Sequence, residues 1–192
     1  MKLFAQHKPP PVSWAVQPKE YVRKPSPMTT PLSCRLATPA DEGALWELLG
    51  PVFRQGVTYV FAIDTPKEVL LAYWMGKDKT TFLVERDGLL VGSYYLKANQ
   101  EGLGNHVCNA GFVVSQKAEG QGIGTWMGCR ALEEAKDRGF LAMQFNFVIQ
   151  TNNRAVVLWT KLGFKVIGEI PEAYRHPELG MVSALILYRK LQ

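Results

Sequence analysis

The sequence predicts a single α/β (α+β) domain, in which a mostly antiparallel sheet of about seven strands carries helices on both faces. Three observations support this prediction. A strand, a glycine-rich turn, a helix and another strand follow one another over residues 106–149, an order that implies a parallel β-α-β crossover. Asp87-Gly88 lies between two apolar segments, which is a strong hairpin signal. Two further strand-like segments close the chain and imply more antiparallel pairing.

The first half of the domain combines one strand, two helices and the hairpin. In chain order we expect these elements over residues 33–37, 38–53, 65–75, 80–86 and 89–97. The first helix begins at Thr38-Pro-Ala-Asp-Glu, where acidic residues occupy the first turn and interact favourably with the helix dipole. The second begins at Thr65-Pro-Lys-Glu, which has the spacing of a capping box.

The second half alternates strands with helices and then closes on two strands. We expect strands over 106–114, 141–149, 164–170 and 181–190, a helix from the glycine-rich turn to Arg138, and a helix over 152–162. Gly163 directly follows the last helix, in the position of a C-terminal cap. Two segments without a clear pattern, residues 53–61 (FRQGVTYVF) and 171–180 (PEAYRHPELG), look able to close over a pocket.

The N-terminal residues differ in composition from the rest of the chain. Residues 1–31 contain seven of the twelve prolines, which favour extended, irregular backbone. Residues 1–30 hold five Lys and Arg against Glu20 alone, so most of the net charge of +5 lies there. We therefore expect a disordered basic tail over 1–31 and a folded domain over 32–192. Whether Met1 or Met28 is the start stays open.

Composition narrows the classes of function. Hydrophobic residues make up 47% and charged residues 20%, as in ordinary globular proteins, and no apolar run is long enough to span a membrane. The first residues lack the apolar stretch of a secretory signal, so we expect a cytoplasmic protein. Three scattered cysteines and three histidines argue against disulfides and metals. A nearly neutral domain argues against a nucleic-acid partner. A homodimer is left open.

The glycine-rich turn carries the most informative chemistry. Gly120, Gly122 and Gly124 allow a tight turn and a close ligand approach. The turn leads into a helix whose first amides have no partner within the helix, and such amides bind phosphates. The spacing is Gly-x-Gly-x-Gly after several strands, unlike the Gly-x-Gly-x-x-Gly of a dinucleotide fold, and no Gly-Lys-Ser/Thr of a nucleotide-triphosphate loop follows. A purely structural turn is the alternative.

Two linked motifs resemble one family. Residues 113–124 resemble the signature loop of the Gcn5-related N-acetyltransferases, Arg/Gln-x-x-Gly-x-Gly. Residues 152–164 (NNRAVVLWTKLGF) resemble that family's second motif at the expected separation. The resemblance covers residues 33–190 and implies acetyl-coenzyme A as the co-substrate. The residues it assigns to the coenzyme are Phe112, Val113 and Val114 on a strand, Gly120, Gln121, Gly122, Ile123, Gly124 and Thr125 in the loop, and Asn152.

The sequence departs from the family pattern at two positions. Glu119 occupies the Arg/Gln position of the loop and places a negative charge near the phosphates. Trp159 occupies the position of a tyrosine that many members are thought to use to protonate the departing thiolate. An indole cannot supply that proton at neutral pH, so the general acid is unassigned.

Two asparagines interrupt apolar strands and need hydrogen-bond partners if they are buried. Asn109 and Asn146 either satisfy neighbouring backbone groups or face the reacting centre. The segments around them, with Asn152, resemble a branch that contains the fungal azetidine-2-carboxylate N-acetyltransferases and bacterial relatives, in which a tryptophan also follows the leucine. That resemblance implies small cyclic secondary amino acids as substrates, Asn109 and Asn146 as substrate-binding residues, and Asn146 as the catalytic residue.

The remaining roles are open. Glu172 or His176 could relay a proton through a water chain, or be solvated loop residues. Arg54 and Arg175 could bind a substrate carboxylate, because a guanidinium matches its geometry, or form surface ion pairs. Two other functions compete with a small-molecule acetyltransferase: a protein N-terminal or lysine acetyltransferase, and a non-catalytic acyl-coenzyme A sensor that uses the tail to bind a partner.

Overall fold

A computed structural model describes residues 30–191, so the predicted tail lies almost entirely outside the described residues. The strands are β1 (Ser33–Leu36), β2 (Thr80–Arg86), β3 (Leu89–Ala98), β4 (Val107–Val114), β5 (Ala142–Ile149), β6 (Lys165–His176) and β7 (Gly180–Lys190). The α-helices are α1 (Glu42–Arg54), α2 (Lys67–Trp74), α3 (Ile123–Asp137) and α4 (Asn153–Lys161).

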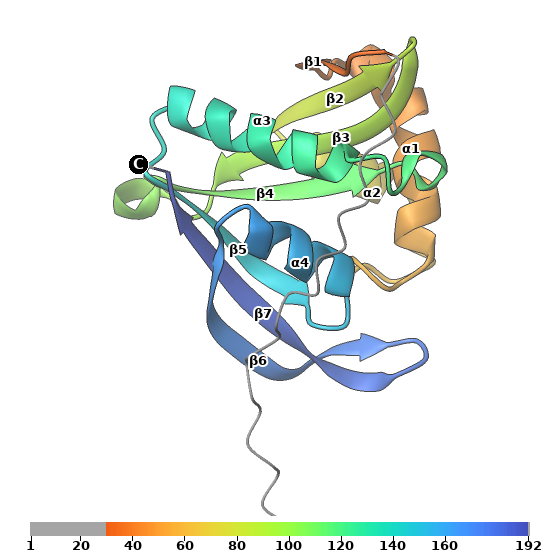
Figure 1. The fold of residues 1–192 in the computed structure, drawn as a ribbon. Coiled ribbons are helices and arrows are strands. Elements are labelled where there is room, and N and C mark those ends of the chain that lie inside the picture. The colour runs from red at the N-terminus through yellow and green to blue at the C-terminus, as the bar shows by residue number, and fades with distance from the viewer. Residues whose placement is uncertain (1–29, 192) are drawn as a thin grey trace, which may run out of the picture.

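The seven strands form one sheet in the order β1-β2-β3-β4-β5-β7-β6. All neighbouring pairs are antiparallel except β4 and β5, which α3 connects as a parallel crossover. Helices α3 and α4 cover one face, and α1 and α2 pack on the other (Figure 1). The predicted mixed sheet of about seven strands with helices on both faces is therefore confirmed.

The sheet opens between its two parallel strands. Pairing of β4 with β5 is limited to Val107 with Ala142 and Cys108 with Met143, at the start of both strands. Beyond these pairs the two strands diverge, as Figure 1 shows, and the backbone edges that face the gap have no neighbouring strand. On its other side β5 keeps its pairing with β7, although the register shifts between Phe145 and Val148. The divergence creates space in the middle of the sheet.

Two apolar cores hold the helices to the sheet. On the α3 and α4 face, Met127, Phe145 and Trp159 belong to one buried cluster. On the α1 and α2 face, Phe53 and Trp74 belong to the other, and the Trp74 indole donates a hydrogen bond to the buried hydroxyl of Ser93 at 2.9 Å. Burial of such side chains supplies most of the favourable free energy of folding. Both faces of the sheet are therefore anchored next to the gap.

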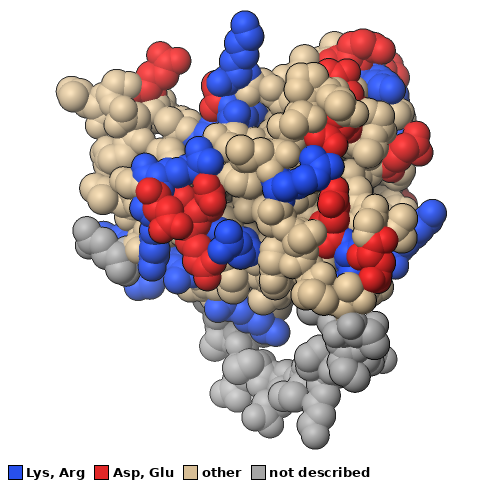
Figure 2. All heavy atoms as spheres, turned by 90° about the horizontal axis from the view of Figure 1, so that it is seen from above, with Lys and Arg blue, Asp and Glu red and all other residues tan. Residues whose placement is uncertain are grey.

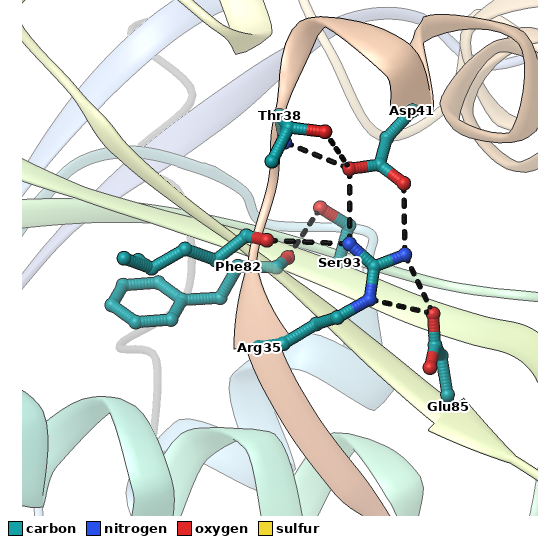
Figure 3. A network of polar contacts seen from close by, with 7 residues as sticks. Arg35, Thr38, Asp41, Phe82, Glu85 and Ser93 are labelled. Atoms are coloured by element: carbon teal, nitrogen blue, oxygen red, sulfur yellow. Dashed lines mark hydrogen bonds and ion pairs between the residues drawn. The ribbon is translucent and has the colours of Figure 1, made fainter.

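An ion-pair network joins β1 to the start of α1 and to β2. The Arg35 guanidinium contacts both oxygens of Asp41 at 2.8 and 2.9 Å and donates to Glu85 at 3.0 Å (Figure 3). The Asp41 carboxylate also accepts from the backbone and hydroxyl of Thr38, at 2.7 and 2.8 Å. These contacts hold the pKa of Asp41 far below its usual range, chiefly through the hydrogen bond from Arg35.

The element boundaries mostly agree with the sequence, with two corrections. Thr65 does not cap α2: its hydroxyl donates backward to the Ala62 carbonyl at 2.7 Å, and Pro66 precedes the first helical residue. The segment PEAYRHPELG is not a loop, because β6 continues through His176 and pairs with β7 on both sides of a bulge between Ile170 and Tyr174. The residues that could close over a pocket are therefore partly in a long hairpin.

The charged residues of the described part of the chain are nearly balanced in sign. Residues 30–191 contain 17 Lys and Arg against 16 Asp and Glu. On the face seen from above, positive and negative side chains alternate (Figure 2). Within the described part of the chain, no helix combines the length and apolar character needed to cross a bilayer.

Candidate functional site

A large cleft lies where β4 and β5 diverge. Its volume is about 1420 Å³, and it runs from the glycine-rich turn before α3 to the loop between α1 and α2. Of the residues predicted to bind the coenzyme or the substrate, those that line the cleft are Asn109, Phe112, Val113, Val114, Gly120, Gly122, Ile123, Gly124, Thr125, Asn146 and Asn152. The topology thus brings together in one place residues that are separated by up to 43 positions along the chain.

The glycine turn places backbone amides at one end of the cleft. Gly120 and Gly122 have φ values of 73° and 79°, which residues with a Cβ atom rarely adopt. A Cβ atom built at either position would have no heavy atom within 4 Å apart from those of the glycine and its chain neighbours. The Trp126 amide donates to the Gly122 carbonyl, so α3 begins there and its earlier amides have no acceptor within the helix. Open space above free amides at a helix start is suited to an anion such as a phosphate.

Gln121 differs from its neighbours in the loop. Its side-chain oxygen accepts a 2.6 Å hydrogen bond from Arg86 on β2, and its side chain does not line the cleft. The prediction that Gln121 contributes to coenzyme binding therefore concerns its backbone amide.

Glu119 has a charged partner that the sequence did not indicate. Its carboxylate forms a 2.5 Å ion pair with Arg154, in the first turn of α4, and both residues line the cleft. The guanidinium offsets the negative charge that Glu119 places beside the glycine turn. Lys161, which also lines the cleft, adds a second cation.

Trp159 packs into the gap between the diverging strands. Its indole lies 4.7 Å from the rings of both Phe112 on β4 and Phe145 on β5, and only 7% of the residue is exposed. Such aromatic packing stabilises the separated strands. The Trp159 ring therefore fills the space between β4 and β5 beneath the cleft. This packing is a structural reason for a tryptophan at this position.

Tyr59, from the loop between α1 and α2, bonds to the open edge of β4. Its hydroxyl donates to the Phe112 carbonyl at 3.0 Å and accepts from the Phe112 amide at 3.1 Å. Burial raises the pKa of Tyr59 above its usual range, so the phenol keeps its proton. One side chain thus satisfies both polar groups that Phe112 directs toward the gap.

The loop that carries Tyr59 is held against β6. The buried hydroxyl of Tyr174 contacts the carbonyl oxygens of Gly56 and Tyr59, at 2.5 and 3.2 Å. The Tyr59 ring also packs edge-to-face on Phe53, with centroids 4.8 Å apart. These contacts place part of the segment FRQGVTYVF over the cleft, and its residues 57–60 belong to the lining.

Asn109 connects the two strands where their pairing ends. Its side-chain amide donates to the Gln144 carbonyl of β5 at 2.8 Å. A side chain thus bridges the strands at the first position after Cys108 and Met143, where no backbone pairing remains. Of the two interpretations of Asn109, the one in which it satisfies a neighbouring backbone group is confirmed, and its exposure to the cleft leaves room for a second role.

Asn146 is more accessible and is held by side chains instead. Its side-chain amide donates to the side-chain oxygen of Asn99 (Oδ1) at 2.6 Å, and its own oxygen accepts from the side-chain amide of Gln144 at 2.8 Å. One N–H of the amide is not used in these bonds, so it can donate to a group in the cleft. Asn152 caps α4 by accepting from the Ala155 amide at 3.2 Å and also lines the cleft.

The part of the cleft beyond Asn109 is built from aromatic and basic side chains. Tyr73 and Tyr95 share a 3.0 Å hydrogen bond between their hydroxyls, and Lys97 lies opposite Asn109 in the β3–β4 register. Gly111 leaves the space that the Tyr95 ring fills, since a Cβ there would lie 2.5 Å from that ring. Among the described lining residues, Glu119 is the only carboxylate.

The two candidate proton relays lie in different surroundings. His176 lines the cleft, and its Nδ1 accepts from the amides of Glu178 and Leu179, both at 3.2 Å. Because Nδ1 is an acceptor in both bonds, a neutral ring carries its proton on Nε2 and cannot take another there. Glu172 is exposed, has a φ of 52° in the β6 bulge and does not line the cleft.

Neither predicted carboxylate-binding arginine lines the cleft. Arg54 donates to the Ile63 carbonyl and lies over the Trp46 ring, 5.6 Å from its centroid. Arg175 is exposed on β6, next to His176, which lines the cleft. Their contacts give no support to a substrate role. The sequence did not indicate Tyr59, Lys97 and Arg154, which line the cleft, or Asn99, which bonds Asn146.

Comparison with known proteins gives the following relatives. The model of the acetyltransferase (GNAT) family matches residues 44–164. N-acetyltransferase aca1 of Schizosaccharomyces pombe is 36% identical over 98 residues, which are 51% of this chain and 47% of that protein. The match therefore spans about half the length of this curated relative.

Solved structures share the fold over most of the chain. A GCN5-related N-acetyltransferase from Kribbella flavida is 36% identical, with a TM-score of 0.78 over 83% of this chain and 97% of that one. A phosphinothricin acetyltransferase from Sinorhizobium meliloti, solved in complex with acetyl-CoA, is 18% identical, with a TM-score of 0.71 over 85% and 89% of the two chains. At that identity, the second likeness concerns the fold alone.

Proposed function

This chain belongs to the acetyltransferase (GNAT) family, and we propose that it transfers the acetyl group of acetyl-CoA to a small cyclic secondary amino acid, such as azetidine-2-carboxylate or a proline analogue. One observation carries the proposal. The free amides at the start of α3 and the open edge of β4 border the same cleft, so that a phosphate and an extended amide-containing arm can be bound together.

The cleft residues suit the coenzyme at both of its ends. The amides of residues 121–125 would hold the pyrophosphate, with Arg154 and Lys161 as nearby cations. The backbone of Phe112, Val113 and Val114 would pair with the pantetheine arm as an added strand pairs with a sheet edge, and Asn152 would bond the same arm. Because Tyr59 now bonds both polar groups of Phe112, its hydroxyl must move aside for this pairing.

The transfer itself requires orientation more than strong acids or bases. The acceptor nitrogen, as a neutral amine, attacks the thioester carbonyl carbon; the C–N bond forms and the C–S bond breaks. The amine proton leaves to water, and the thiolate takes a proton from water, because the Trp159 indole N–H is too weak an acid to supply one at neutral pH. The unused N–H of Asn146 would stabilise the negative charge that develops on the carbonyl oxygen.

Two features support a small acceptor. The loop of residues 57–60 and the side chains of Tyr73 and Tyr95 border the acceptor part of the cleft, so a compact molecule can be surrounded there. Asn109 and Asn146 stand at the positions that the azetidine-2-carboxylate branch would assign to the acceptor. We propose that Asn146 acts at the reacting centre. Asn109 would both bridge the two strands and bind the acceptor.

The folded domain should suffice for this activity. We propose that residues 32–192 form the complete acetyltransferase domain and that the preceding tail is dispensable for turnover. Deletion of residues 1–27 should leave kcat and KM unchanged within a factor of about two. Loss of activity on deletion would instead favour a role of the tail in a sensor that works by binding a partner.

The test is thiol release from acetyl-CoA, with azetidine-2-carboxylate, proline analogues and simple peptides as parallel acceptors. Turnover with the cyclic amino acids, reduced at least ~100-fold in Asn146→Ala, is the expected result. Efficient turnover of peptides alone would instead identify a protein acetyltransferase. Coenzyme binding without turnover on any amine would overturn the proposal.

A further inference from the structure

We propose that Lys97 binds the carboxylate of the acceptor and makes the enzyme selective for amines that carry one. This inference rests on the proposed acetyl transfer and concerns the residue that selects among acceptors. It follows from an imbalance of charge beside the cleft, from the position of Lys97 in the sheet, and from the distribution of carboxylates in the lining.

The charge imbalance involves two lysines and one aspartate. The Asp78 carboxylate contacts the ammonium of Lys79 at 2.9 and 3.2 Å and that of Lys97 at 3.3 Å. Lys79, and secondarily Lys97, lower the pKa of Asp78, so this carboxylate stays ionised at neutral pH. One negative charge is thus shared by two positive charges, and one positive charge remains uncompensated within this group.

Lys97 is the member of the pair that can reach a ligand. Only 6% of the Lys79 side chain is exposed, and its ammonium lies over the Tyr73 ring at 4.7 Å, whereas 31% of the Lys97 side chain is exposed. Lys79 also forms the shorter contact with Asp78. The better-compensated cation is therefore buried, and the less-compensated one lines the cleft.

The position of Lys97 matches the expected place of an acceptor. Lys97 pairs with Asn109, which is three residues from Phe112 along β4, a separation of roughly 10 Å. A lysine side chain, together with a small amino acid whose carboxylate is bound to the lysine ammonium, can span the distance from Lys97 to the level of Phe112. Asn109 and Asn146 line the same part of the cleft and can bond to the rest of the molecule.

The lining also disfavours cationic acceptors. Among its described residues Glu119 is the only carboxylate, and it is paired with Arg154 at the opposite end of the cleft. A lysine side chain or another cation at the acceptor end would meet Lys97 and no carboxylate of the lining. An acceptor carboxylate would instead form a charge-assisted hydrogen bond to the Lys97 ammonium.

The experiment compares each acceptor acid with its own neutral amide. Steady-state kinetics would be measured with azetidine-2-carboxylate and azetidine-2-carboxamide for the wild type, Lys97→Met and Lys97→Arg. We expect Lys97→Met to raise KM for the acid at least ~10-fold, to leave KM for the amide within about twofold, and to change kcat little. Lys97→Arg keeps the charge and should restore most of the affinity for the acid.

Asp78→Asn separates binding from a structural role. If Lys97 matters only through its ion pair with Asp78, removal of either partner raises KM alike, and the inference is wrong. If Lys97 binds the acceptor, Asp78→Asn frees its ammonium and should lower KM for the acid several-fold. Equal effects of Lys97→Met on acid and amide would also overturn the inference. Absence of turnover with every amine would instead be a failure of the proposed acetyl transfer.

Discussion

The hydroxyl of Tyr59 bonds both the N–H and the carbonyl of Phe112, at 3.1 and 3.0 Å, where β4 has lost its neighbouring strand. A single phenol thus occupies the stretch of backbone that we assign to the pantetheine arm. With that assignment, coenzyme binding along β4 would exclude the contact between Tyr59 and Phe112. We therefore propose that Tyr59 and the coenzyme compete for the same two hydrogen-bonding groups.

Tyr59→Phe should strengthen coenzyme binding. Without the hydroxyl, the Phe112 groups need no release, and we expect Kd for acetyl-CoA to fall about fivefold, as removal of a competing hydrogen bond of about 1 kcal/mol implies. Isothermal titration calorimetry gives this Kd. Tyr174→Phe is the matched control, because it frees the same loop but keeps the Tyr59 hydroxyl. An equal gain in the control would show that loop freedom, and not competition, sets the affinity.

Asn109 and Asn146 should respond differently to truncation. Asn109→Ala removes the bridge to the Gln144 carbonyl and should lower the free energy of unfolding by about 1 kcal/mol or more, because that carbonyl loses its partner. Asn146→Ala, at an exposed position, should cost about 0.5 kcal/mol or less while abolishing most turnover. Urea unfolding and thiol release on the same preparations check both. Equal destabilisation by the two variants would contradict the assignment.

The Glu119–Arg154 pair should show strong coupling in coenzyme binding. Arg154→Ala leaves Glu119 uncompensated beside the proposed phosphate site, and we expect Kd for acetyl-CoA to rise about tenfold at low salt. Glu119→Gln frees Arg154 and should tighten binding. A double-mutant cycle checks the pair: Glu119→Gln should improve binding more in the Arg154→Ala background than in the wild type, because only there is the Glu119 charge uncompensated. Independent, additive effects of the two substitutions would mean that the two charges do not act as a pair.

Trp159 should be replaceable by another aromatic residue without loss of chemistry. Trp159→Phe keeps a ring between Phe112 and Phe145, so kcat should stay within a factor of about three and stability should fall by about 1 kcal/mol. Trp159→Ala should cost about 3–5 kcal/mol. Thiol release and thermal unfolding give both values. A large drop in kcat for the stable phenylalanine variant would assign a chemical role to the indole.

Asp41 should contribute to the acid sensitivity of the fold. Its pKa is lower in the folded state than in the unfolded chain, where it is about 3.9, so its stabilisation is present above that pH and is lost as the pH falls below it. Asp41→Asn should lower stability by about 1 kcal/mol at pH 7, through loss of the charge-assisted hydrogen bonds from Arg35, and less at pH 3. Urea unfolding between pH 3 and 7 checks this; an unchanged slope below pH 4 would contradict it.

Local signals in the sequence were sufficient for most of the fold. The hairpin at Asp87-Gly88 forms as expected, with φ values of 53° and 73° that this turn requires, and the glycine turn precedes α3 as predicted. The end of β6 was misjudged because the bulge near Glu172 breaks the alternation of apolar and polar residues that identifies a strand.

The candidate site was predictable only where a motif marks it. The glycine turn and Asn152 belong to recognisable spacings, whereas Tyr59 lies in a loop without a pattern and reaches Phe112 across 53 positions. The roles proposed for Lys97 and Arg154 depend on their ion-pair partners, Asp78 and Glu119, which only the fold brings close to them. The prediction that Arg54 and Arg175 bind a substrate carboxylate rests on the chemistry of their side chains alone. That chemistry does not indicate the direction in which a side chain points.

The most direct test of acetyl transfer is the fate of the acetyl group itself. Acetyl-CoA labelled with ¹³C in the acetyl group would be incubated with the protein and azetidine-2-carboxylate, and the products quantified by mass spectrometry and NMR. We predict one equivalent of acceptor acetylated at the ring nitrogen for each equivalent of thiol released, and at least ~100-fold slower product formation with Asn146→Ala. Thiol release that yields free labelled acetate, or label that stays on the coenzyme with every amine tested, would contradict the account.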